Sequence, residues 1–598
     1  DTAELQRVAA TLGLAHPTGY PLYTLFGWLW SHLPLGGTPA WRMNLFSAAA
    51  AALTIGVVYL IGRALGQRRI IAGAVAATLA ASRTFWSQAT IAEVYALAAL
   101  LQGALILAVL RWRAGRLPFW AVGLMLGLGL AHHRAIILMI PGLLLFLALS
   151  RRAPLDRPAL GLVEIGAALV ALLGPCLLYL YLPLRAPTGA NPLRLLWEYA
   201  SGADMASAWL DLPRLWSEGS GRLLDLARRF VWPQMLPFGG LLALLGAIHL
   251  LWRDRAGAAL LIAGYGAVVA FCAAYYVDDV EVFFISAHLI AALLIGEGAM
   301  LVRRTTTDHQ GSRIEDRGSK IEGCRSSILD LLLVVGRWSF IDPLLLALPA
   351  LLLIGNLSYI RAANTLDDEL AARTLLAEPL PTGALVIGDW ASTEGPHYLQ
   401  AVEGLRPDLQ FGVLANREVI LDMLAHGRAV YLMKPVPALG LAQQPEGRLW
   451  RVSVRPLAAK TRADIRWDEG IVLSGYTLPR GPCRPGDVVP IALAWRVKGP
   501  LHLPYTLFVH LVAADGTIWG QLDRAPTATP TDRWRPGAQP VDLYAPVLDP
   551  ATPPGHYRVN IGWYAYPSMQ RLGLAAGDSP QQAGDYVTIG EIEVAPAR

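Results

Sequence analysis

The stretch "NLFSAAAAALTIGVVYLIG" (residues 44–62) decides the fold class, because it runs for 19 residues without a charged side chain. A helix needs about 20 predominantly apolar residues to cross the hydrocarbon core of a membrane. Three arginines follow at once in "RALGQRR" (63–69), and an excess of Lys and Arg marks connections on the cytoplasmic side. The sequence therefore predicts a membrane-spanning helix that ends in the cytoplasm.

Further apolar runs repeat this pattern along the first 360 residues. Every second connection between them is basic, so these connections are predicted to be cytoplasmic. Residues 1–43 would then face outward, and we expect a further transmembrane helix before Asp1 to have carried them across. The prediction is a multi-pass protein of the cell (plasma) membrane with about ten spans. The other predicted spans are 70–84, 93–110, 118–133, 135–150, 159–182, 236–252, 257–277, 283–302 and 340–357.

The composition agrees with a membrane protein and argues against other classes. Hydrophobic residues make up 54% of the chain and charged residues 16%, whereas soluble domains carry about 25% charged residues. The basic residues lie in short connections rather than in one patch, so we expect no nucleic-acid partner. The four cysteines include no CxxC pair, so neither a metal cluster nor a disulfide framework is predicted.

Beyond the last span the chain becomes soluble in character. Strand-like and helix-like pieces first alternate, as in "GALVIGDW" and "EVILDMLAHG", which predicts a small α/β unit with parallel strands. Period-two strands separated by Pro and Gly turns then predict an antiparallel β-sandwich. The predicted domains are an outer segment with an acid motif (1–43), a polytopic α-helical bundle (44–357) with a cytoplasmic loop (303–337), an extracytoplasmic α/β domain (358–462) and an extracytoplasmic β-sandwich (463–598).

Two acids, Asp1 and Glu4, open the chain. On a helix their spacing places both carboxylates on one face. At a membrane boundary such a pair can act as a general base or hold a divalent metal ion, but acids also favour an ordinary solvated helix start. The next motif, "AHPTGYPLY" (15–23), contains His16 and Tyr20. Its prolines exclude a straight helix, so it either lines a cavity or forms a structural loop.

More polar groups lie at the predicted outer ends of spans. An acid there is costly unless it is paired or faces water, and arginine can bind phosphate oxygens with two hydrogen bonds. The alternatives are solvated interfacial acids, a satisfied core histidine and a snorkelling arginine. These candidates are Glu93, His132, His133, Arg134, Arg185, Asp278 and Asp279.

All these groups are predicted on one face of the membrane, which suits a lipid-borne phosphate ester better than a water-soluble substrate. A transporter or flippase of lipid-linked or envelope components is the first alternative. It should show polar or broken helices at mid-membrane and often a repeat, and the sequence contains no evident repeat. A non-catalytic envelope scaffold is the second alternative.

The same motifs resemble a known family. "LGLAHPTGYPLY" and "RMNLFSA", with "FWSQATIAEVYAL", "AHHR", "YLPLRA" and "YYVDDVEVFF", resemble bacterial multi-pass proteins that are similar to transmembrane protein O-mannosyltransferases of the GT-C glycosyltransferase superfamily. The resemblance covers roughly residues 1–300. It implies a hexosyltransferase that moves a sugar, mannose among the candidates, from a polyprenyl-phosphate donor to an outer acceptor hydroxyl with inversion.

The resemblance also implies roles for individual residues. Asp1 matches the family's catalytic acid and Glu4 its second acid, while His133, Arg134 and Arg185 are candidates to bind the leaving phosphate. A divalent metal ion is an option rather than a requirement, and the acceptor is a protein, a lipid or a polysaccharide. The outer domains are expected to bind that acceptor. Four tryptophans could stack on sugars there or form the core: Trp495, Trp519, Trp534 and Trp563.

Overall fold

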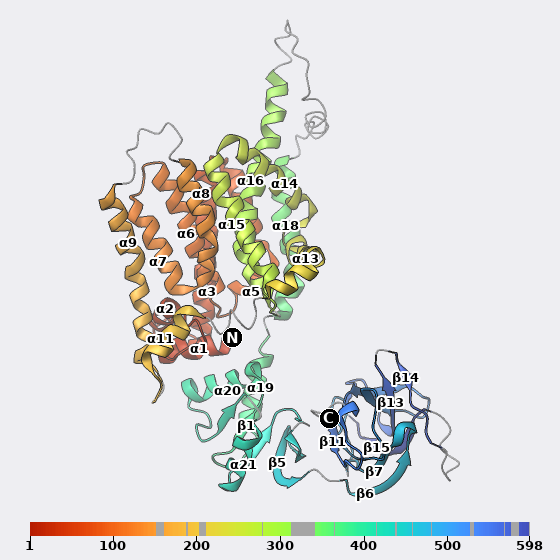
Figure 1. Ribbon diagram of the computed structural model, residues 1–598. Helices are drawn as coiled ribbons and strands as arrows, with labels where there is room; N and C mark the ends of the chain where they lie inside the picture. Colours follow the sequence, from red (N-terminus) through yellow and green to blue (C-terminus); the bar gives the residue numbers. More distant parts are fainter. Residues whose placement is uncertain are drawn as a thin grey trace. The chain divides into compact units, whose positions relative to one another are not determined.

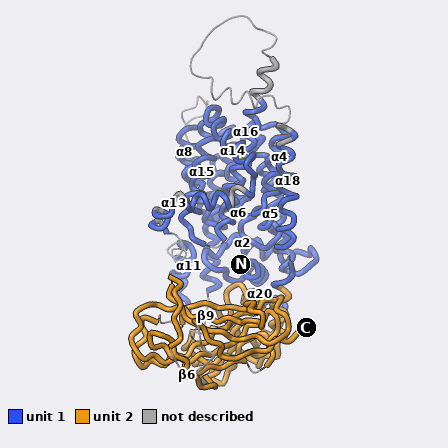
Figure 2. Tube along the Cα trace, turned by 90° about the vertical axis from the view of Figure 1, so that its right-hand side faces the viewer, with its two compact units in different colours: residues 1–368, 401–403 blue, residues 369–400, 404–598 orange. Residues whose placement is uncertain are grey.

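The computed structural model describes most of the chain, and the chain forms two compact units. Unit 1 contains residues 1–368 and 401–403, and unit 2 contains residues 369–400 and 404–598 (Figure 2). The described residues are 1–150, 161–186, 189–202, 211–277, 279–311, 341–363, 365–413, 416–436, 439–456, 459–479, 481–526, 531–566, 568–575 and 585–596.

The secondary structure elements of unit 1 in its described part are helices joined by irregular segments (Figure 1). Its first half contains α1 (Thr2–Thr11), α2 (Pro21–Ser31), α3 (Pro39–Ala64), α4 (Arg69–Ala81), α5 (Arg83–Ala89), α6 (Tyr95–Arg113), α7 (Phe119–His132), η1 (Arg134–Met139) and α8 (Ile140–Ser150). Its second half contains α9 (Leu162–Cys176), η2 (Leu177–Leu180), α10 (Tyr181–Leu184), α11 (Pro192–Ser201), α13 (Leu212–Leu226), η3 (Ala227–Val231), α14 (Trp232–Arg253), α15 (Arg255–Ala274), η4 (Val280–Phe284), α16 (Ile285–Gly311) and α18 (Ile341–Ala363).

In the part of the chain that the structure describes, most of each of the ten apolar runs is helical, which confirms a polytopic helical membrane protein. Among the described residues, seven helices are long and apolar enough to span a membrane, and the number is eight if the bent pair α4–α5 is counted as one span. The predicted spans 118–133 and 135–150 correspond to shorter apolar helices. Helix α16 extends to Gly311, so residues 303–311, predicted as the start of a loop, are helical. Residues 312–337 of that loop lie outside the described part.

Close helix contacts in unit 1 depend on glycine. A Cβ atom at Gly123 or Gly127 of α7 would lie 2.2 Å from a backbone carbonyl oxygen of α9. Gly246 of α14 and Gly298 of α16 face each other's helix in the same way, at 1.8 and 2.0 Å. Small residues let membrane helices approach closely because packing, rather than the hydrophobic effect, drives their association.

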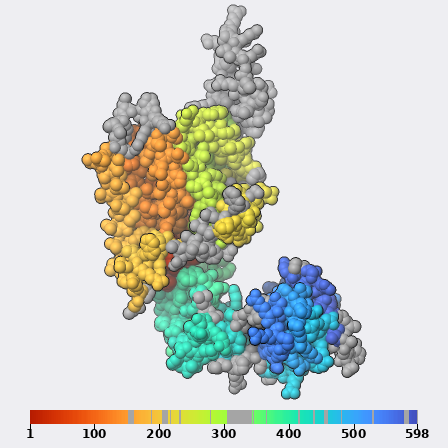
Figure 3. Space-filling model, in the orientation of Figure 1, coloured from red at the N-terminus to blue at the C-terminus, as the bar shows by residue number. Residues whose placement is uncertain are grey.

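The helices differ in how deeply they are buried. In the span that contains α16, 89% of the apolar window is buried, whereas the span that contains α9 is 11% buried. Accordingly α9 lies at one margin of unit 1 in the ribbon and space-filling views (Figures 1 and 3). Helix α16 is therefore the centre of the bundle, and the apolar side chains of α9 are available to lipid.

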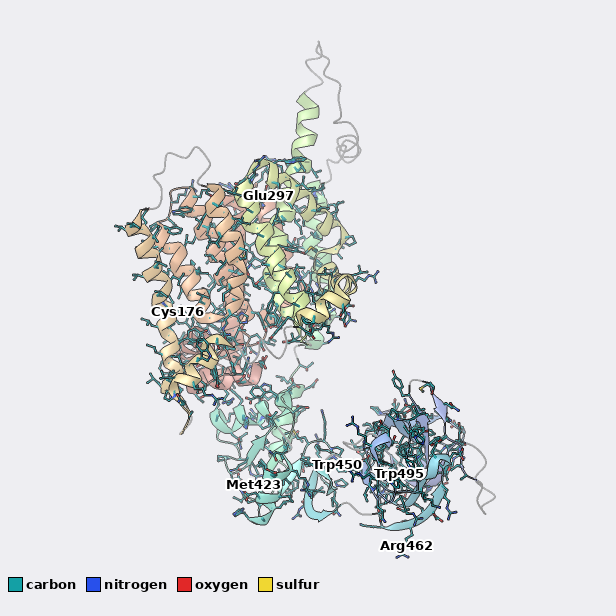
Figure 4. All side chains as sticks on the ribbon, in the orientation of Figure 1. Cys176, Glu297, Met423, Trp450, Arg462 and Trp495 are labelled. Carbon is teal, nitrogen blue, oxygen red and sulfur yellow. The ribbon has the colours of Figure 1, made fainter. Side chains whose placement is uncertain are left out.

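One buried acid lies at the end of the bundle remote from the N-terminus. Glu297 of α16 is fully buried (Figure 4). Its Oε1 accepts a hydrogen bond from Gln67 Nε2 at 3.2 Å, and its Oε2 lies 3.2 Å from Arg253 Nη1 and 3.3 Å from His249 Nδ1. A buried charge needs such partners, so this group joins α14, α16 and the connection between α3 and α4.

Unit 2 begins with a mixed sheet. It contains β2 (Gln410–Gly412), β1 (Leu385–Ile387), β3 (Val430–Leu432), β5 (Leu449–Pro456) and β4 (Leu441–Glu446), in that spatial order. Strands β1, β2 and β3 are parallel, as predicted, and α20 (Trp390–Glu403) and α21 (Arg417–Ala425) connect them. The β4–β5 hairpin is antiparallel, a feature that the sequence analysis had not predicted.

The rest of unit 2 consists of two antiparallel sheets that share one apolar core. One has the order β11-β8-β7-β6, and the other β12-β10-β9-β13-β14 with β15 beside β13. Trp495 and Trp563 are fully buried in the shared core and Trp534 is nearly so, so these three side chains have a packing role. The strands are β6 (Thr461–Arg466), β7 (Ile471–Thr477), β8 (Ile491–Val497), β9 (Tyr505–Val512), β10 (Ile518–Arg524), β11 (Val541–Tyr544), β12 (Val547–Leu548), β13 (Gly555–Ala565), β14 (Gln570–Arg571) and β15 (Val587–Val594).

Candidate active site

The first two helices and the segment between them carry the acid motif. Asp1 is the N-cap of α1, and Glu4 lies in its first turn. Irregular backbone follows α1, as the prolines predicted, and α2 begins at Pro21. Tyr20 precedes Pro21 with a positive φ of 42°, a conformation that costs energy for a bulky residue. The surrounding contacts therefore hold Tyr20 in place.

Glu4 and His16 form the tightest polar contact of the site. The backbone N–H of His16 donates to Glu4 Oε1 at 2.8 Å, and Nδ1 of the ring donates to Glu4 Oε2 at 2.6 Å. The Glu4 side chain is 2% exposed. Both carboxylate oxygens are thus occupied by His16, and the ring orientation is fixed.

The other ring nitrogen of His16 faces Tyr20 and Asp1. With the proton on Nδ1, the Tyr20 hydroxyl donates to His16 Nε2 at 3.0 Å. Asp1 Oδ2 lies 3.7 Å from the same nitrogen, and the Asp1 side chain is 41% exposed. Asp1 is therefore the carboxylate of this group that can meet a substrate from solution.

Aromatic contacts connect this group to the ends of other helices. The rings of Tyr20 and His133 are parallel, with centroids 5.9 Å apart. His133 also packs against Tyr95 at 5.7 Å and Phe283 at 6.1 Å. Burial raises the pKa of the Tyr20 hydroxyl far above its usual range, so Tyr20 keeps its proton near neutral pH.

Glu93 lies in the connection between α5 and α6, and it is buried. The Thr2 hydroxyl donates to Glu93 Oε1 at 3.1 Å. The backbone N–H and C=O of Glu93 pair with the Ser47 hydroxyl of α3 at 3.3 and 3.4 Å. Burial, and more weakly the charge of Asp279, raise the pKa of Glu93 above its usual value. The structure thus brings Glu93 to the first turn of α1.

Two other predicted residues bind backbone carbonyl groups near the site. His132 is fully buried, and its Nε2 donates to the Val94 carbonyl at 2.8 Å. Arg134 Nη2 donates to the Tyr199 carbonyl at the end of α11, and a Cβ atom at Gly202 would collide with its guanidinium. Both side chains therefore have structural partners.

The last predicted residues lie at exposed positions or outside the described part. Arg185 is exposed at the end of α10 beside Tyr181, whose hydroxyl donates to the Gly13 carbonyl at 2.7 Å. Asp279 is exposed before η4. Asp278 lies outside the described residues.

Sequence reasoning missed the partners that complete the site. Thr2 and Ser47 bind Glu93, and Phe283 packs against His133. Thr2 lies between the two quoted acids and Phe283 within the quoted "YYVDDVEVFF", but their contacts join segments that are distant in the chain. The one sequence signal for Thr2 and Phe283 was that they lie within or next to the quoted motifs.

One group of the described residues contains donor atoms that are close enough together to hold a metal ion. Ligand atoms of Asp1, Glu4 and His16 lie within 4.8 Å of one another. The donor types suit a divalent cation. However, both Glu4 oxygens already accept hydrogen bonds from His16, and His16 Nε2 is within hydrogen-bond distance of the Tyr20 hydroxyl. As arranged, the group fits a hydrogen-bonded acid–histidine pair better than a metal centre.

The N-terminal quarter of the chain matches a known family model. Residues 1–155 match the model described as the protein O-mannosyl-transferase TMEM260 N-terminal domain. The chain is similar to protein O-mannosyl-transferase TMEM260 of Mus musculus, with 33% identity over 150 residues, which are 23% of this chain and 21% of that protein. It is also similar to the Dictyostelium discoideum protein of that name, with 37% identity over 62 residues, which are 10% of this chain and 8% of that protein. The chain thus covers about a fifth of the length of the mouse relative and less than a tenth of the Dictyostelium relative.

Solved structures give weaker likenesses. ArnT from Cupriavidus metallidurans bound to undecaprenyl phosphate aligns with a TM-score of 0.45 and 12% identity, covering 75% of this chain and 92% of that one. The archaeal oligosaccharyltransferase AglB from Archaeoglobus fulgidus aligns with a TM-score of 0.38 and 11% identity, covering 100% and 94%. Both TM-scores are too low to establish a shared fold. The sequence matches nevertheless confirm the resemblance to transmembrane protein O-mannosyltransferases over residues 1–155, which include Asp1, Glu4, His16, Glu93 and Arg134.

Proposed function

We propose that the protein is a membrane glycosyltransferase of the GT-C type. It transfers a hexose, with mannose the first to test, from a polyprenyl-phosphate donor to an extracytoplasmic acceptor hydroxyl with inversion. The observation that carries the proposal is the exposed Asp1 carboxylate beside a fixed Glu4–His16 pair. This group lies in the region that matches the O-mannosyltransferase model.

Asp1 is the general base in this proposal. The acceptor oxygen attacks the anomeric carbon, the bond from that carbon to the phosphate oxygen breaks, and the acceptor proton passes to Asp1. One displacement inverts the anomeric centre. Glu4 accepts two hydrogen bonds from His16 and is therefore a positioning residue, which revises the paired catalytic role first predicted for it. His16 Nε2 lies 3.7 Å from Asp1 Oδ2. Because Nε2 carries no proton, it can accept a hydrogen bond from Asp1, in place of the Tyr20 hydroxyl, once Asp1 has taken the acceptor proton.

The leaving polyprenyl phosphate develops charge that cations stabilise. Arg185 is the proposed phosphate ligand, because its side chain is exposed beside the segment that carries His16. Arg134 already binds the Tyr199 carbonyl, so we assign it to holding α11 in place. His133 supports Tyr20 by stacking. Asp279, which is exposed, is proposed to bind sugar hydroxyls. Glu93 was predicted as a substrate ligand, but it is buried and bonded to Thr2, so we assign it to holding the first turn of α1 in place.

The proposed partners follow from the placement of the site. The donor's lipid tail would lie among the spans of the cell membrane, and the site would face the extracytoplasmic side. The acceptor is a protein, a lipid or a polysaccharide, and the two soluble domains are proposed to bind it. If a divalent metal ion binds, Asp1 is the ligand with an available carboxylate, and the ion would supply charge stabilisation there.

A donor panel tests the proposal. The protein is expressed from its full gene, reconstituted in lipid vesicles and given radiolabelled polyprenyl-phosphate sugars one at a time. Each donor is offered with protein, lipid and polysaccharide acceptors, with and without EDTA. We expect one sugar donor to be consumed, and Glu418→Gln, a change at an exposed acid of α21, to leave its consumption unchanged. If a folded protein consumes none of the donors but moves a labelled lipid-linked sugar between leaflets, it is a transporter. If it does neither, the scaffold alternative holds.

A further inference from the structure

Two helices of unit 1 are interrupted at neighbouring positions. Helices α4 and α5 meet at Ser82 with a bend of 70°. Helix α14 contains a non-helical residue, Leu236 (φ 56°, ψ 165°), followed by Pro237. A break leaves carbonyl groups at the end of one helical segment and N–H groups at the start of the next without helical partners. In a membrane these groups need other partners.

Side chains from two other helices supply those partners. Asn356 of α18 donates from Nδ2 to the Ala81 carbonyl at 2.9 Å. Gln234 of α14 accepts from the Thr84 backbone N–H at 3.0 Å and donates to the Thr84 hydroxyl at 2.8 Å. Gln234 and Asn356 are 3% and 8% exposed. Each satisfies one side of the bend, and together they fix the direction in which α5 leaves α4.

A third contact stabilises the start of α5. The guanidinium of Arg83 lies 3.5 Å from the centre of the Tyr359 ring of α18. Such a contact is attractive because the face of an aromatic ring carries negative charge density. Helix α5 is thus held by α14 and α18, which provide none of the side chains in the Glu4–His16 group.

Helix α5 leads directly to the candidate site. It ends at Ala89, and Glu93 and Val94 follow after three residues. The C-terminal end of this short connection is fixed by Ser47, which bonds Glu93, and by His132, which bonds Val94. The position of its N-terminal end depends on the direction of α5, which the bend at Ser82 sets. The position of Glu93 is therefore set partly by Gln234 and Asn356.

We propose that Gln234 and Asn356 are positioning residues that set the place of Glu93 against α1 by fixing the α4–α5 bend. The catalytic part of this inference rests on the proposed glycosyltransferase function. Loss of either side chain turns the connection at residues 90–94 and separates Glu93 from Thr2.

The first test measures position without activity. Thr2→Cys and Glu93→Cys are combined in a background in which the native cysteines are replaced by alanine. A short bifunctional thiol crosslinker then joins the pair, because the Thr2 hydroxyl lies 3.1 Å from Glu93 Oε1, at the end of a side chain that cysteine does not match in length. We expect the crosslink to form in this pair, and Gln234→Leu or Asn356→Leu to lower its yield at least threefold. Thr78→Val is the matched control, since Thr78 bonds its own helix one turn before the bend. An unchanged yield in both leucine variants overturns the proposal.

The second test measures turnover per folded protein in the native-cysteine background. Gln234→Leu is expected to lower kcat at least tenfold and to change the KM for the lipid donor less than threefold, because the donor phosphate ligands stay in place. Gln234→Glu, protonated in this buried setting, keeps both bonds and should restore most of the rate. A normal kcat in Gln234→Leu overturns the proposal. An inactive wild type with the predicted crosslinking pattern contradicts the glycosyltransferase function and leaves the positional inference supported.

Discussion

Replacing Glu4 by glutamine tests the Glu4–His16 pair, which orients the whole group. Glu4 is 2% exposed and accepts two hydrogen bonds from His16, the shorter of them 2.6 Å. Glutamine has nearly the same shape but carries no charge. It offers one acceptor oxygen instead of two, so one of the two His16 donors meets an amide N–H. The ring should then lose its fixed orientation while the fold around it persists.

The magnitude follows from the lost charge-assisted hydrogen bond. Hydrogen bonds to charged groups contribute about 1.5–3 kcal/mol, and each 1.36 kcal/mol of barrier corresponds to about a tenfold change in rate. If His16 orients Asp1 in the transition state, Glu4→Gln should lower kcat roughly 10- to 150-fold. The KM for the donor should change little, because the lipid phosphate is bound elsewhere.

The assay is steady-state transfer in vesicles with the donor identified by the panel, at several pH values. Glu418→Gln is the control for a neutralised acid on an exposed helix start. A Glu4→Gln enzyme that retains kcat within threefold of wild type, with its thermal stability unchanged, would refute the role of the pair. A large rise in the donor KM alone would show instead that Glu4 acts in donor binding.

Three further predictions concern stability. Gly298→Val should abolish folded protein in detergent, because a Cβ atom there would lie 2.0 Å from the backbone of α14. Gly166 of α9 has open space around it, so Gly166→Val should keep the melting temperature within about 2 °C of the wild-type value. Hydrogen bonds from Ser392 lower the pKa of Asp389 from 3.8 to about 2. The Asp389 carboxylate therefore stabilises unit 2 above pH 4, and this contribution is lost as the pH falls toward 2. Asp389→Asn should accordingly remove the pH dependence of the unfolding free energy between these two values. Glu297→Ala should destabilise unit 1 by about 1.5–3 kcal/mol in denaturant titration, because Gln67, His249 and Arg253 lose the carboxylate that they share. An equal melting curve would contradict that role.

The sequence predicts the membrane helices well because their signal is local. An apolar run such as 44–62 must be helical in lipid wherever its neighbours lie. The strands of unit 2 were also predictable, since period-two alternation and turn residues are local signals. The α4–α5 bend was not predictable, because Ser82 alone does not break a helix. It is stabilised by Gln234 and Asn356, which are distant in the chain.

The candidate site was predictable only in its parts. The motifs named Asp1, Glu4, His16 and Tyr20, and the structure places these residues in one group. Their separate roles were not predictable, since a buried carboxylate and an exposed one look alike in a sequence. The stack of Tyr20 on His133 joins α2 to the end of α7, and only the folded chain reveals such a contact.

The central claim is that the exposed Asp1 carboxylate is the base of a sugar transfer. The most direct test compares wild type with Asp1→Asn in a single-turnover reaction with the labelled polyprenyl-phosphate sugar and its acceptor. Asparagine keeps the shape of the side chain and cannot take the proton. The account predicts that donor binding persists while the transfer rate falls at least a hundredfold. Transfer by Asp1→Asn at the wild-type rate would contradict it.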